Sequence, residues 1–401
     1  MRIVLVTPGQ PSLNPRIVKE ANALSAAGHE VIVLYCHWIA WADEADKTIL
    51  NDSPWKAVLV GGSPTKNKLP YYFTKVFFRL YKLLGKYDVF QNCLAERLQA
   101  RGYNSLLRKA KSLKANYYIG HNLGALAVVV NAAKFHNAKC GFDFEDYHRN
   151  EYGLDNHRRT ARIIFLEEKY IRKVDYLSFS SKPIQRQIIL DFPSFKKPQI
   201  LLQNCFSINE LSINIRVPDN ELKLFWFSQT VGPNRGLECL FEALMLLNDE
   251  DISLTLIGRI REDIEESFTA MANKVPGKVS FSGTVNPYEL HTIANNHDVG
   301  LALEPGFSIN NDLALSNKIF TYLLAGNAII FSETTAQKKF NEQTNAGCSF
   351  TPGNAEQLAE CIKIYKDPTK LIQQKKHNLL LAKNSFNWEK ESERLIEIIS
   401  Q

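Results

Sequence analysis

The chain has 401 residues, of which 45% are hydrophobic and 22% are charged; this composition is typical of a folded globular protein, and the length favours two domains over one. The formal net charge of +6 suits an anionic ligand or a membrane surface but does not by itself indicate a nucleic-acid partner, and we expect none. The seven cysteines include no CxxC pair and no apolar run reaches the roughly 20 residues of a spanning helix, so we expect no disulfide framework, zinc site or membrane span, and a cytoplasmic location.

The first elements are predicted to form a β-α-β unit. The apolar segment 2–7 predicts a buried strand and lacks the layout of a signal peptide, and in the turn after it Gly9 would let the backbone approach a ligand. Pro15 begins a helix that ends at Gly28, and segment 31–35 is the second strand. Such a unit implies a parallel sheet. The turn is not GxGxxG, which argues against an NAD-dependent enzyme.

Segment 69–87 predicts a helix with two chemically distinct faces. No acidic residue occurs between Ser53 and Tyr87. At 100° per residue, the basic residues share one narrow arc beside a broad apolar one; they are Lys75, Arg79, Lys82 and Lys86, beside Phe73, Val76, Phe77, Leu80, Leu83 and Leu84. This pattern is typical of a helix lying on an anionic bilayer, and also of an ordinary surface helix with solvated lysines. We predict peripheral membrane contact through residues 70–87.

Two further strands of the first half end in polar residues. The strand ending at Ile119 is followed by His121, and the strand 139–142 is followed by a polar segment that contains Glu145 and His148. A carboxylate or an imidazole at a strand end could orient or deprotonate a substrate hydroxyl. The alternative is a polar loop that caps the following helix.

The second half repeats the strand, turn and helix pattern, so a second parallel sheet is expected. We place the domain boundary in the polar stretch that ends at Pro218. The predicted strand 222–227 is followed by a polar loop that begins with Ser228 and Gln229 and contains Arg235. A helix over 237–247 is predicted after this loop. A loop of this kind, with an arginine before a helix, could hold phosphate oxygens.

Segment 304–332 combines a strand end with a helix start. Glu304 ends an apolar strand, Ser316 is an expected N-cap, and Gly326 ends the helix before the strand 328–331. The free N–H groups of this helix start, its positive dipole end and Lys318 would converge on an anion such as a diphosphate. Asn317 belongs to the same helix start, and Thr321 lies one turn on. The alternative is an ordinary cap with a solvated lysine.

Three tracts together resemble retaining glycosyltransferases of family 4: NPRIVKEANALSAAGHEVIVL, WFSQTVGPNRGLECLFEAL and LSNKIFTYLLAGNAII, the last similar to the SNKxFxYLLAG donor-site signature of one subgroup. The resemblance implies an α/β chain with the GT-B fold, in which two Rossmann-like parallel-sheet domains face each other across a cleft. Residues 1–203 would bind the acceptor and residues 204–384 the nucleotide-sugar. Residues 385–401 would form a helix that returns to the first domain.

The implied activity is transfer of a sugar from a nucleotide-diphosphate sugar to an acceptor hydroxyl with retention, in surface polysaccharide or glycolipid synthesis. The acceptor would be a sugar, a glycan or a lipid-linked precursor, and neither a cofactor nor a metal is expected, although Asp143-x-Glu145 is similar to a DxD metal motif. Arg235, Lys318 and Glu304 are the expected catalytic residues. The expected donor-binding residues are Gly9, Ser228, Gln229, Arg235, Glu304, Ser316, Asn317, Lys318 and Thr321; those on the acceptor side are His121, Glu145 and His148.

The sequence departs from this family at two donor positions. Thr321 stands where relatives carry the second glutamate of a pair, and Ser228-Gln229 stands in place of Gly-Arg. A hydroxyl is a weaker partner for ribose than a carboxylate, and one phosphate-binding cation is lost. Two alternatives therefore stay open: a nucleotide-sugar epimerase of the same fold, and a catalytically inactive scaffold. The turns at Gly258 and 285–288 are candidates for contact with the base.

Overall fold

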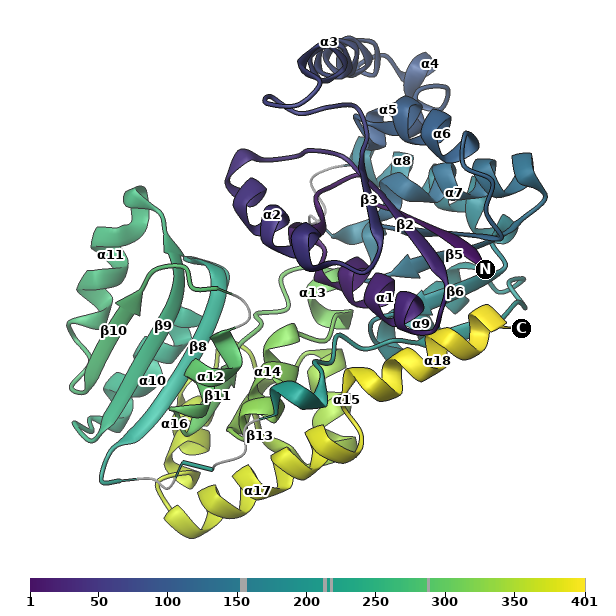
Figure 1. The fold of residues 1–401 in the computed structure, drawn as a ribbon. Helices are drawn as coiled ribbons and strands as arrows, with labels where there is room; N and C mark the ends of the chain where they lie inside the picture. The colour runs from purple at the N-terminus through teal and green to yellow at the C-terminus, as the bar shows by residue number, and fades with distance from the viewer. Residues whose placement is uncertain (152–156, 212–214, 217–218, 287–288, 401) are drawn as a thin grey trace. The chain divides into compact units, whose positions relative to one another are not determined.

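A computed structural model of the chain describes residues 1–151, 157–211, 215–216, 219–286 and 289–400 (Figure 1). The chain divides into two compact units, one formed by Met1–Leu202 with the segment that starts at Ser392, the other by Gln203–Glu391. Pro218, where the predicted linker ends, and Tyr288 of the predicted base-contacting turn lie outside the described residues.

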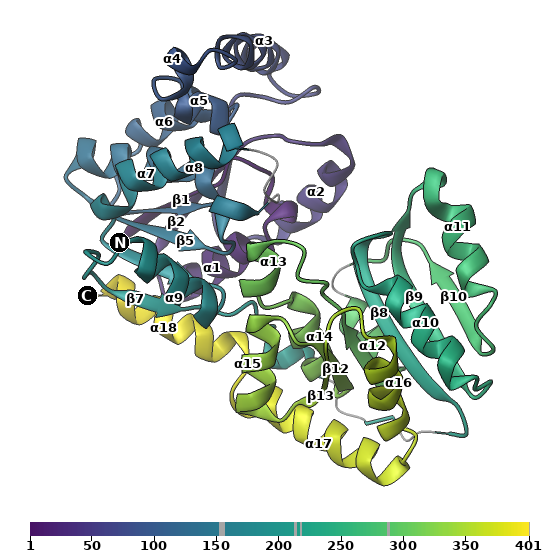
Figure 2. The same ribbon diagram turned by 180° about the vertical axis from the view of Figure 1, so that it is seen from behind.

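The first unit contains a seven-stranded parallel sheet in the order β3-β2-β1-β4-β5-β6-β7. Its strands are β1 (Arg2–Val6), β2 (Glu30–Tyr35), β3 (Lys56–Leu59), β4 (Tyr117–His121), β5 (Lys139–Phe144), β6 (Tyr176–Phe179) and β7 (Gln199–Leu201). Its helices are α1 (Pro15–Ala26), α2 (Asp43–Asp52), α3 (Lys68–Leu84), α4 (Asp88–Gln91), α5 (Ala95–Gln99), α6 (Tyr103–Lys111), α7 (Leu123–His136), α8 (His157–Tyr170) and α9 (Lys182–Asp191). Figures 1 and 2 show them on both faces of the sheet.

Apolar strands and well-started helices explain this layer structure. Every residue of β1 except Arg2 is buried. Helix α1 begins where Pro15 supplies a fixed φ and the Asn14 side chain accepts a hydrogen bond from the Ile17 N–H at 3.1 Å. Helix α7 is buried along most of its length because nearly all its residues are small or aliphatic. The strands therefore form a parallel sheet that helices cover on both faces, as parallel sheets require.

The second unit contains a six-stranded parallel sheet in the order β10-β9-β8-β11-β12-β13. Its strands are β8 (Leu222–Val231), β9 (Ile252–Ile260), β10 (Lys278–Ser282), β11 (Val299–Ala302), β12 (Ala328–Ser332) and β13 (Gly347–Phe350). Its helices are α10 (Leu237–Leu247), α11 (Glu262–Ala272), α12 (Leu290–Asn295), α13 (Ile309–Leu313), α14 (Asn317–Ala325), α15 (Thr335–Thr344), α16 (Ala355–Ile364) and α17 (Pro368–Asn384). The α/β class and the two parallel sheets confirm the predicted fold class.

The last helix, α18 (Trp388–Ser400), begins in the second unit and ends in the first. Leu395, Ile398 and Ile399 join the core of the first unit, where they pack with Ile3 and Leu5 of β1. The second half of α18 is therefore part of the core of the first unit.

Two predicted turns lie within strands of the structure. Ser228 and Gln229 were expected in a loop, but β8 continues through them to Val231, with a register shift against β9 between Phe227 and Thr230. Strand β9 likewise continues through Gly258 to Ile260, because the backbone ladder does not depend on apolar side chains.

The expectation about cysteines also needs a correction. Cys348 of β13 and Cys361 of α16 form a disulfide, with their Cα atoms 5.7 Å apart. Their spacing in the sequence carries no signal for this pair, because the contact arises from the packing of α16 against β13. The structure has one bridge here and no framework among the other five cysteines.

Candidate functional site

The second sheet has its topological switch point between β8 and β11. These strands are neighbours, and the chain continues from them in opposite directions across the sheet, to β9 and β10 on one side and to β12 and β13 on the other. Ligands of open α/β sheets bind outside the carboxyl ends of the strands at such a point. The Arg235 loop follows β8 and Glu304 follows β11, so both predicted donor segments lie at this edge.

Glu304 lies in a nearly closed polar site. Its side chain, in a residue 9% exposed, accepts hydrogen bonds from Lys318 Nζ at 2.9 Å and from Asn311 Nδ2 at 2.8 Å. Its backbone N–H donates to Ser332 Oγ at 2.9 Å. Burial alone would raise the pKa of Glu304, but the Lys318 ammonium and the hydrogen bonds outweigh it, so the pKa is lowered. Glu304 is therefore an ionised, fixed acceptor.

Lys318, in the first turn of α14, is held in place by its ion pair with Glu304. Its ammonium lies 2.9 Å from Glu304 Oε1, 3.4 Å from Ser316 Oγ and 5.7 Å from the centre of the Trp226 ring. We predicted that Lys318 binds a diphosphate and that Glu304 binds the sugar as separate groups. The structure brings the two charges together, so each neutralises the other where no ligand is bound.

Arg235 lies in a loop with an unusual backbone. Asn234 (φ 60°) and Gly236 (φ 76°) on either side of it have left-handed conformations. A Cβ atom at Gly236 would lie 3.1 Å from Leu303 Cβ, so this loop packs directly against the residue before Glu304. Arg235 is half-buried, and its guanidinium has no ion pair or hydrogen bond with any residue that the structure describes. It is an uncompensated cation at the sheet edge.

The other predicted donor residues differ in accessibility. Gln229 is exposed and Ser228 half-buried, both in the irregular part of β8. Ser316 occupies the N-cap position of α14, but its side chain does not cap the helix and instead accepts from Lys318. Asn317 Oδ1 accepts a hydrogen bond from Asn204 Nδ2 at 2.9 Å. Thr321 is 2% exposed and its hydroxyl faces the Asn317 carbonyl at 3.5 Å, so it turns toward its own helix.

The first sheet has its own switch point, between β1 and β4. Gly9 follows β1, and its N–H faces Thr7 Oγ1 at 3.3 Å while a Cβ atom there would meet only that same oxygen, at 4.0 Å. Asn122 follows β4 and accepts hydrogen bonds from Thr7 and Asn14. The Gly9 carbonyl also accepts a hydrogen bond from the Cys36 N–H at 3.2 Å, and the role of Gly9 in donor binding stays a prediction.

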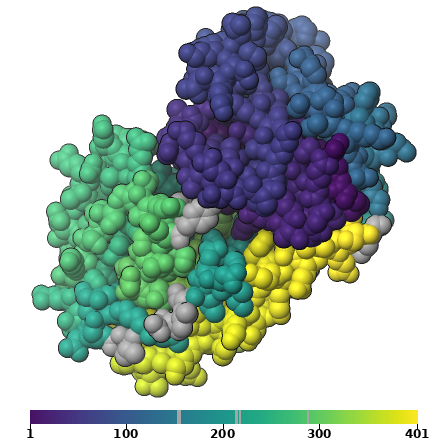
Figure 3. Space-filling model, viewed as in Figure 1, coloured from purple at the N-terminus to yellow at the C-terminus, as the bar shows by residue number. Residues whose placement is uncertain are grey.

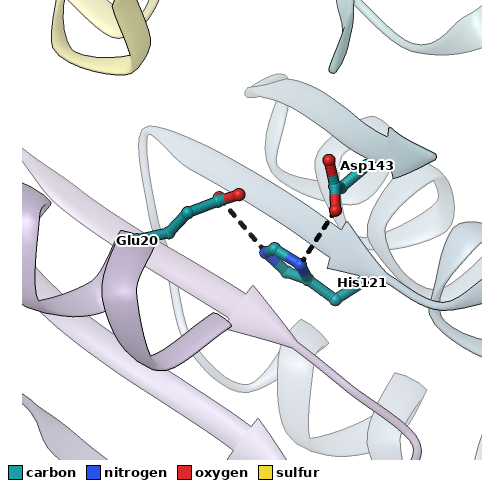
Figure 4. A group of neighbouring side chains, drawn as sticks. All are labelled: Glu20, His121 and Asp143. Atoms are coloured by element: carbon teal, nitrogen blue, oxygen red, sulfur yellow. Dashed lines mark ion pairs between the residues drawn. The ribbon is translucent and has the colours of Figure 1, made fainter. Parts of the chain in front are cut away.

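His121, at the end of β4, is the centre of a buried charge network (Figure 4). Its Nε2 lies 3.2 Å from Glu20 and its Nδ1 lies 3.6 Å from Asp143. Burial alone would lower the pKa of His121, but the two carboxylates raise it to about 10. Arg16 binds both oxygens of Asp143, at 2.6 and 2.8 Å. His121 is 0% exposed, so in this structure it positions Glu20 and Asp143, and its role on the acceptor side stays a prediction.

The same network bears on metal binding. Glu20, His121 and Asp143 bring three ligand atoms within 4.8 Å of one another. Two cations, Arg16 and the protonated imidazole, already balance the two carboxylates, and a metal would need a neutral imidazole beside the Arg16 guanidinium. The residues therefore fit a closed ion network better than a metal.

Glu145 and His148 follow β5. Burial raises the pKa of Glu145 to about 7, and the Asp146 carboxylate adds to the increase. A carboxyl group with this pKa can accept or donate a proton near neutral pH. His148 is 5% exposed, packs on the Phe144 ring at 5.9 Å between centres and pairs with Glu151 at 3.7 Å. Of the three predicted acceptor residues, Glu145 has the properties closest to those of an acid-base group.

Sequence reasoning missed several residues of these sites. Asn311 fixes Glu304, and Trp226 lies beneath Lys318. Arg16 and Glu20 build the buried network from α1. The spacing of Arg16 and Glu20, four residues apart on a predicted helix, was an available signal, although such pairs usually lie in solvent.

The chain was compared with known proteins. No known family model and no curated protein matches it in sequence. Solved structures do match. HepE from Anabaena in complex with UDP and glucose is 15% identical with a TM-score of 0.71, covering 100% of this chain and 99% of that chain. Sucrose-phosphate synthase from Thermosynechococcus elongatus is 13% identical with a TM-score of 0.73, covering 100% and 98%.

A glycosyltransferase from Rickettsia africae is 14% identical with a TM-score of 0.69, covering 99% of this chain and 97% of that chain. At these identities the likeness establishes the fold alone. The two parallel sheets, each with its own switch point, and the match along the whole length show that the chain has the GT-B fold of glycosyltransferases, with two Rossmann-like domains.

Proposed function

We propose that this chain is a retaining glycosyltransferase of family 4 that moves a sugar from a nucleotide-diphosphate sugar to an acceptor hydroxyl. The observation that carries the proposal is Arg235, an unpaired cation among the described residues, held by a left-handed loop beside the buried Glu304–Lys318 pair at the switch point. A diphosphate supplies the anionic partner that this arginine lacks. The fold shared with glycosyltransferases supports the same reading.

The barrier to sugar transfer is departure of the diphosphate from an oxocarbenium-like carbon. Groups that bind the leaving group more strongly as its charge grows lower this barrier. We assign this role to Arg235, to the free N–H groups at the start of α14 and to Gln229. Lys318 joins them if the incoming diphosphate draws its ammonium away from Glu304 Oε1. That oxygen then accepts a hydrogen bond from the donor sugar, while Oε2 keeps its bond from Asn311. No cofactor or metal is part of the proposal.

Glu145 is the proposed acid-base group on the acceptor side. Its pKa, raised to about 7 by burial, lets it take the proton of the acceptor hydroxyl near neutral pH. His148 supports the segment by packing on Phe144. Gly9, after β1 of the first unit, is a further proposed donor-binding residue, because a glycine there lets the backbone approach a ligand.

Arg235→Ala tests the phosphate-binding role. The turnover number should fall by about a hundredfold to a thousandfold, as when one preorganised charge-stabilising donor is removed, while the thermal unfolding curve stays unchanged because Arg235 has no partner within the described structure. The matched control is Arg261→Ala, since Arg261 is an exposed arginine of the same unit that pairs with Asp263. Wild-type turnover in Arg235→Ala would refute the assignment.

UDP-glucose is the first donor to test, because HepE was solved with it. A transferase should bind it in calorimetry, transfer glucose to an acceptor and, without acceptor, release at most a little glucose by hydrolysis. An epimerase would change the sugar without any acceptor. Absence of binding to UDP, GDP, ADP and their sugars would indicate an inactive scaffold, for which the buried Thr321 in place of a glutamate is the sequence argument.

We also propose a cytoplasmic, membrane-associated role in surface polysaccharide or glycolipid synthesis, with contact through residues 70–87 and a lipid-linked acceptor. No described helix combines the length and apolar character needed to cross a bilayer. The basis for peripheral contact is the two-faced character of α3.

A further inference from the structure

Helix α3 presents an apolar face that nothing in the described chain covers. Of its 17 residues only Tyr71 is buried. Leu69 is 75% exposed, Val76 61% and Leu83 58%. At 100° per residue these three lie on one arc, together with the exposed Tyr72, Phe73, Phe77 and Leu80. In the space-filling view this region is the blue surface at the top (Figure 3). Soluble monomers rarely expose so continuous an apolar surface without a partner.

A basic groove borders this face. A cavity of about 290 Å³ is lined by Trp38, Lys75, Phe78, Arg79, Lys82 and Arg101. Three of its four cations come from one side of α3, and Arg101 comes from the segment after α5. None of the four forms an ion pair with any residue that the structure describes. Aromatic rings hold some of them in place, since Lys82 Nζ lies 4.7 Å from the centre of Phe78 and Arg101 lies 5.0 Å from that of Tyr71.

The charges decide what occupies this surface. A protein partner for the apolar face alone would not need beside it four cations that form no ion pair within the described part of the chain. The stretch between Ser53 and Tyr87 contains no acidic residue to neutralise them. An anionic bilayer offers both components at once, acyl chains for the apolar face and phosphates for the groove. Arginine and lysine are the side chains that bind phosphate oxygens, and in this groove they lie beside aromatic rings.

We propose that the groove binds the headgroup phosphate of an anionic membrane lipid while the apolar face of α3 enters the outer part of that bilayer leaflet. This deepens the proposed membrane contact by naming a ligand and a site. It rests on the proposed function only in assuming that the protein works at a membrane. Because vesicle binding is measured without sugar transfer, failure of either proposal is seen separately.

The test is flotation of the full-length protein with vesicles. Vesicles of phosphatidylcholine with phosphatidic acid should carry the protein upward, and vesicles of phosphatidylcholine alone should not. At equal surface potential, phosphatidic acid should bind more tightly than oleate, because the groove recognises phosphate and not charge alone. Equal binding of the two would overturn the headgroup site.

Substitutions separate the groove from general charge. The triple variant Lys75→Gln/Arg79→Gln/Lys82→Gln should weaken binding to phosphatidic acid vesicles about a hundredfold. Each basic residue near an anionic surface contributes about fivefold to the binding constant, and three are removed. The control Lys173→Gln/Lys182→Gln/Lys196→Gln removes three exposed charges of the same unit outside the groove and should change binding much less. Equal losses in the two triple variants would contradict the proposal.

Arg101 tests the groove without touching α3. Arg101→Gln should lower the preference for phosphatidic acid over oleate, whereas Arg108→Gln, at an exposed position of α6, should not. Phe73→Ser/Leu80→Ser should reduce vesicle binding while the protein stays folded, because both side chains are exposed. Two further results would overturn the proposal. One is that glycerol phosphate binds as tightly as vesicles do. The other is that the protein does not bind vesicles but forms a dimer, and that Phe73→Ser/Leu80→Ser dissociates this dimer.

Discussion

His121 shows how far a residue's role depends on packing that the sequence does not reveal. Its position at a strand end was predictable from the apolar run before it. Its partners were not, because Arg16 and Glu20 lie on α1, more than a hundred residues earlier, and turn inward as a fully buried pair. The same holds for Glu304 and Lys318: sequence reasoning placed both at one edge of the sheet, but their direct contact at 2.9 Å required the fold of the intervening loop.

The buried network predicts a pH dependence of stability. The pKa of His121 in the fold is about 10, above its ordinary value of 6.5, so folding favours the protonated ring. Its contribution is fully present below about pH 6.5 and is lost as the pH rises through 10. We expect the opening free energy of the first unit, measured by hydrogen exchange of β4, to fall between pH 7 and pH 10.

Replacing the histidine should remove that slope. His121→Asn should lower the opening free energy at pH 7 by about 3–5 kcal/mol, the usual cost of breaking a buried charge pair, and flatten the profile toward pH 10. His136→Asn is the control, since His136 stacks on Tyr118 outside the network and should leave the slope intact. A wild-type profile in His121→Asn would mean that the imidazole is neutral in the fold.

At the scale of elements, helix ends were easier to predict than strand ends. The predicted helix 237–247 is α10 to the residue, because Gly236 and Asn248 at its two ends adopt left-handed conformations that stop a helix. Strands β8 and β9 were predicted too short, since Ser228-Gln229 and Gly258-Arg259 have the composition of turns. Backbone pairing continues through them across an irregularity that side-chain patterns do not reveal.

Gly236 connects an element boundary to function. Gly236→Ala should destabilise the second unit by about 1–2 kcal/mol from the left-handed backbone, and the contact of 3.1 Å with Leu303 should displace the Arg235 loop. We therefore expect a raised KM for the donor or a lower turnover number. Gly353→Ala is the control: its φ of 82° gives the same backbone strain, but no atom lies within 4 Å of the added Cβ. Identical kinetics in the two variants would show that the loop tolerates displacement.

At the scale of the whole molecule, the two parallel sheets followed from the repeated strand, turn and helix pattern. Their exact strand orders did not follow from it, because a sequence gives the succession of strands and not their neighbours. The predicted divisions at 203/204 and 384/385 stay predictions; the compact units change at Leu202 and again after Glu391 within α18. The return of the last helix to the first domain was expected only from the family resemblance.

This return of the chain makes the stability of the first unit depend on its last residues. Leu395 is 0% exposed in the core that contains Ile3 and Leu5, so Leu395→Ala should lower the opening free energy of the first unit by about 2–5 kcal/mol. Hydrogen exchange followed by peptide mass analysis should show faster exchange in β1 and β4 and little change in β11 and β12. Leu371→Ala is the matched control, since Leu371 is 1% exposed in the core of the second unit and should give the reverse pattern. Faster exchange in both units after either substitution would mean that the two cores unfold together, so that α18 transmits stability from one unit to the other.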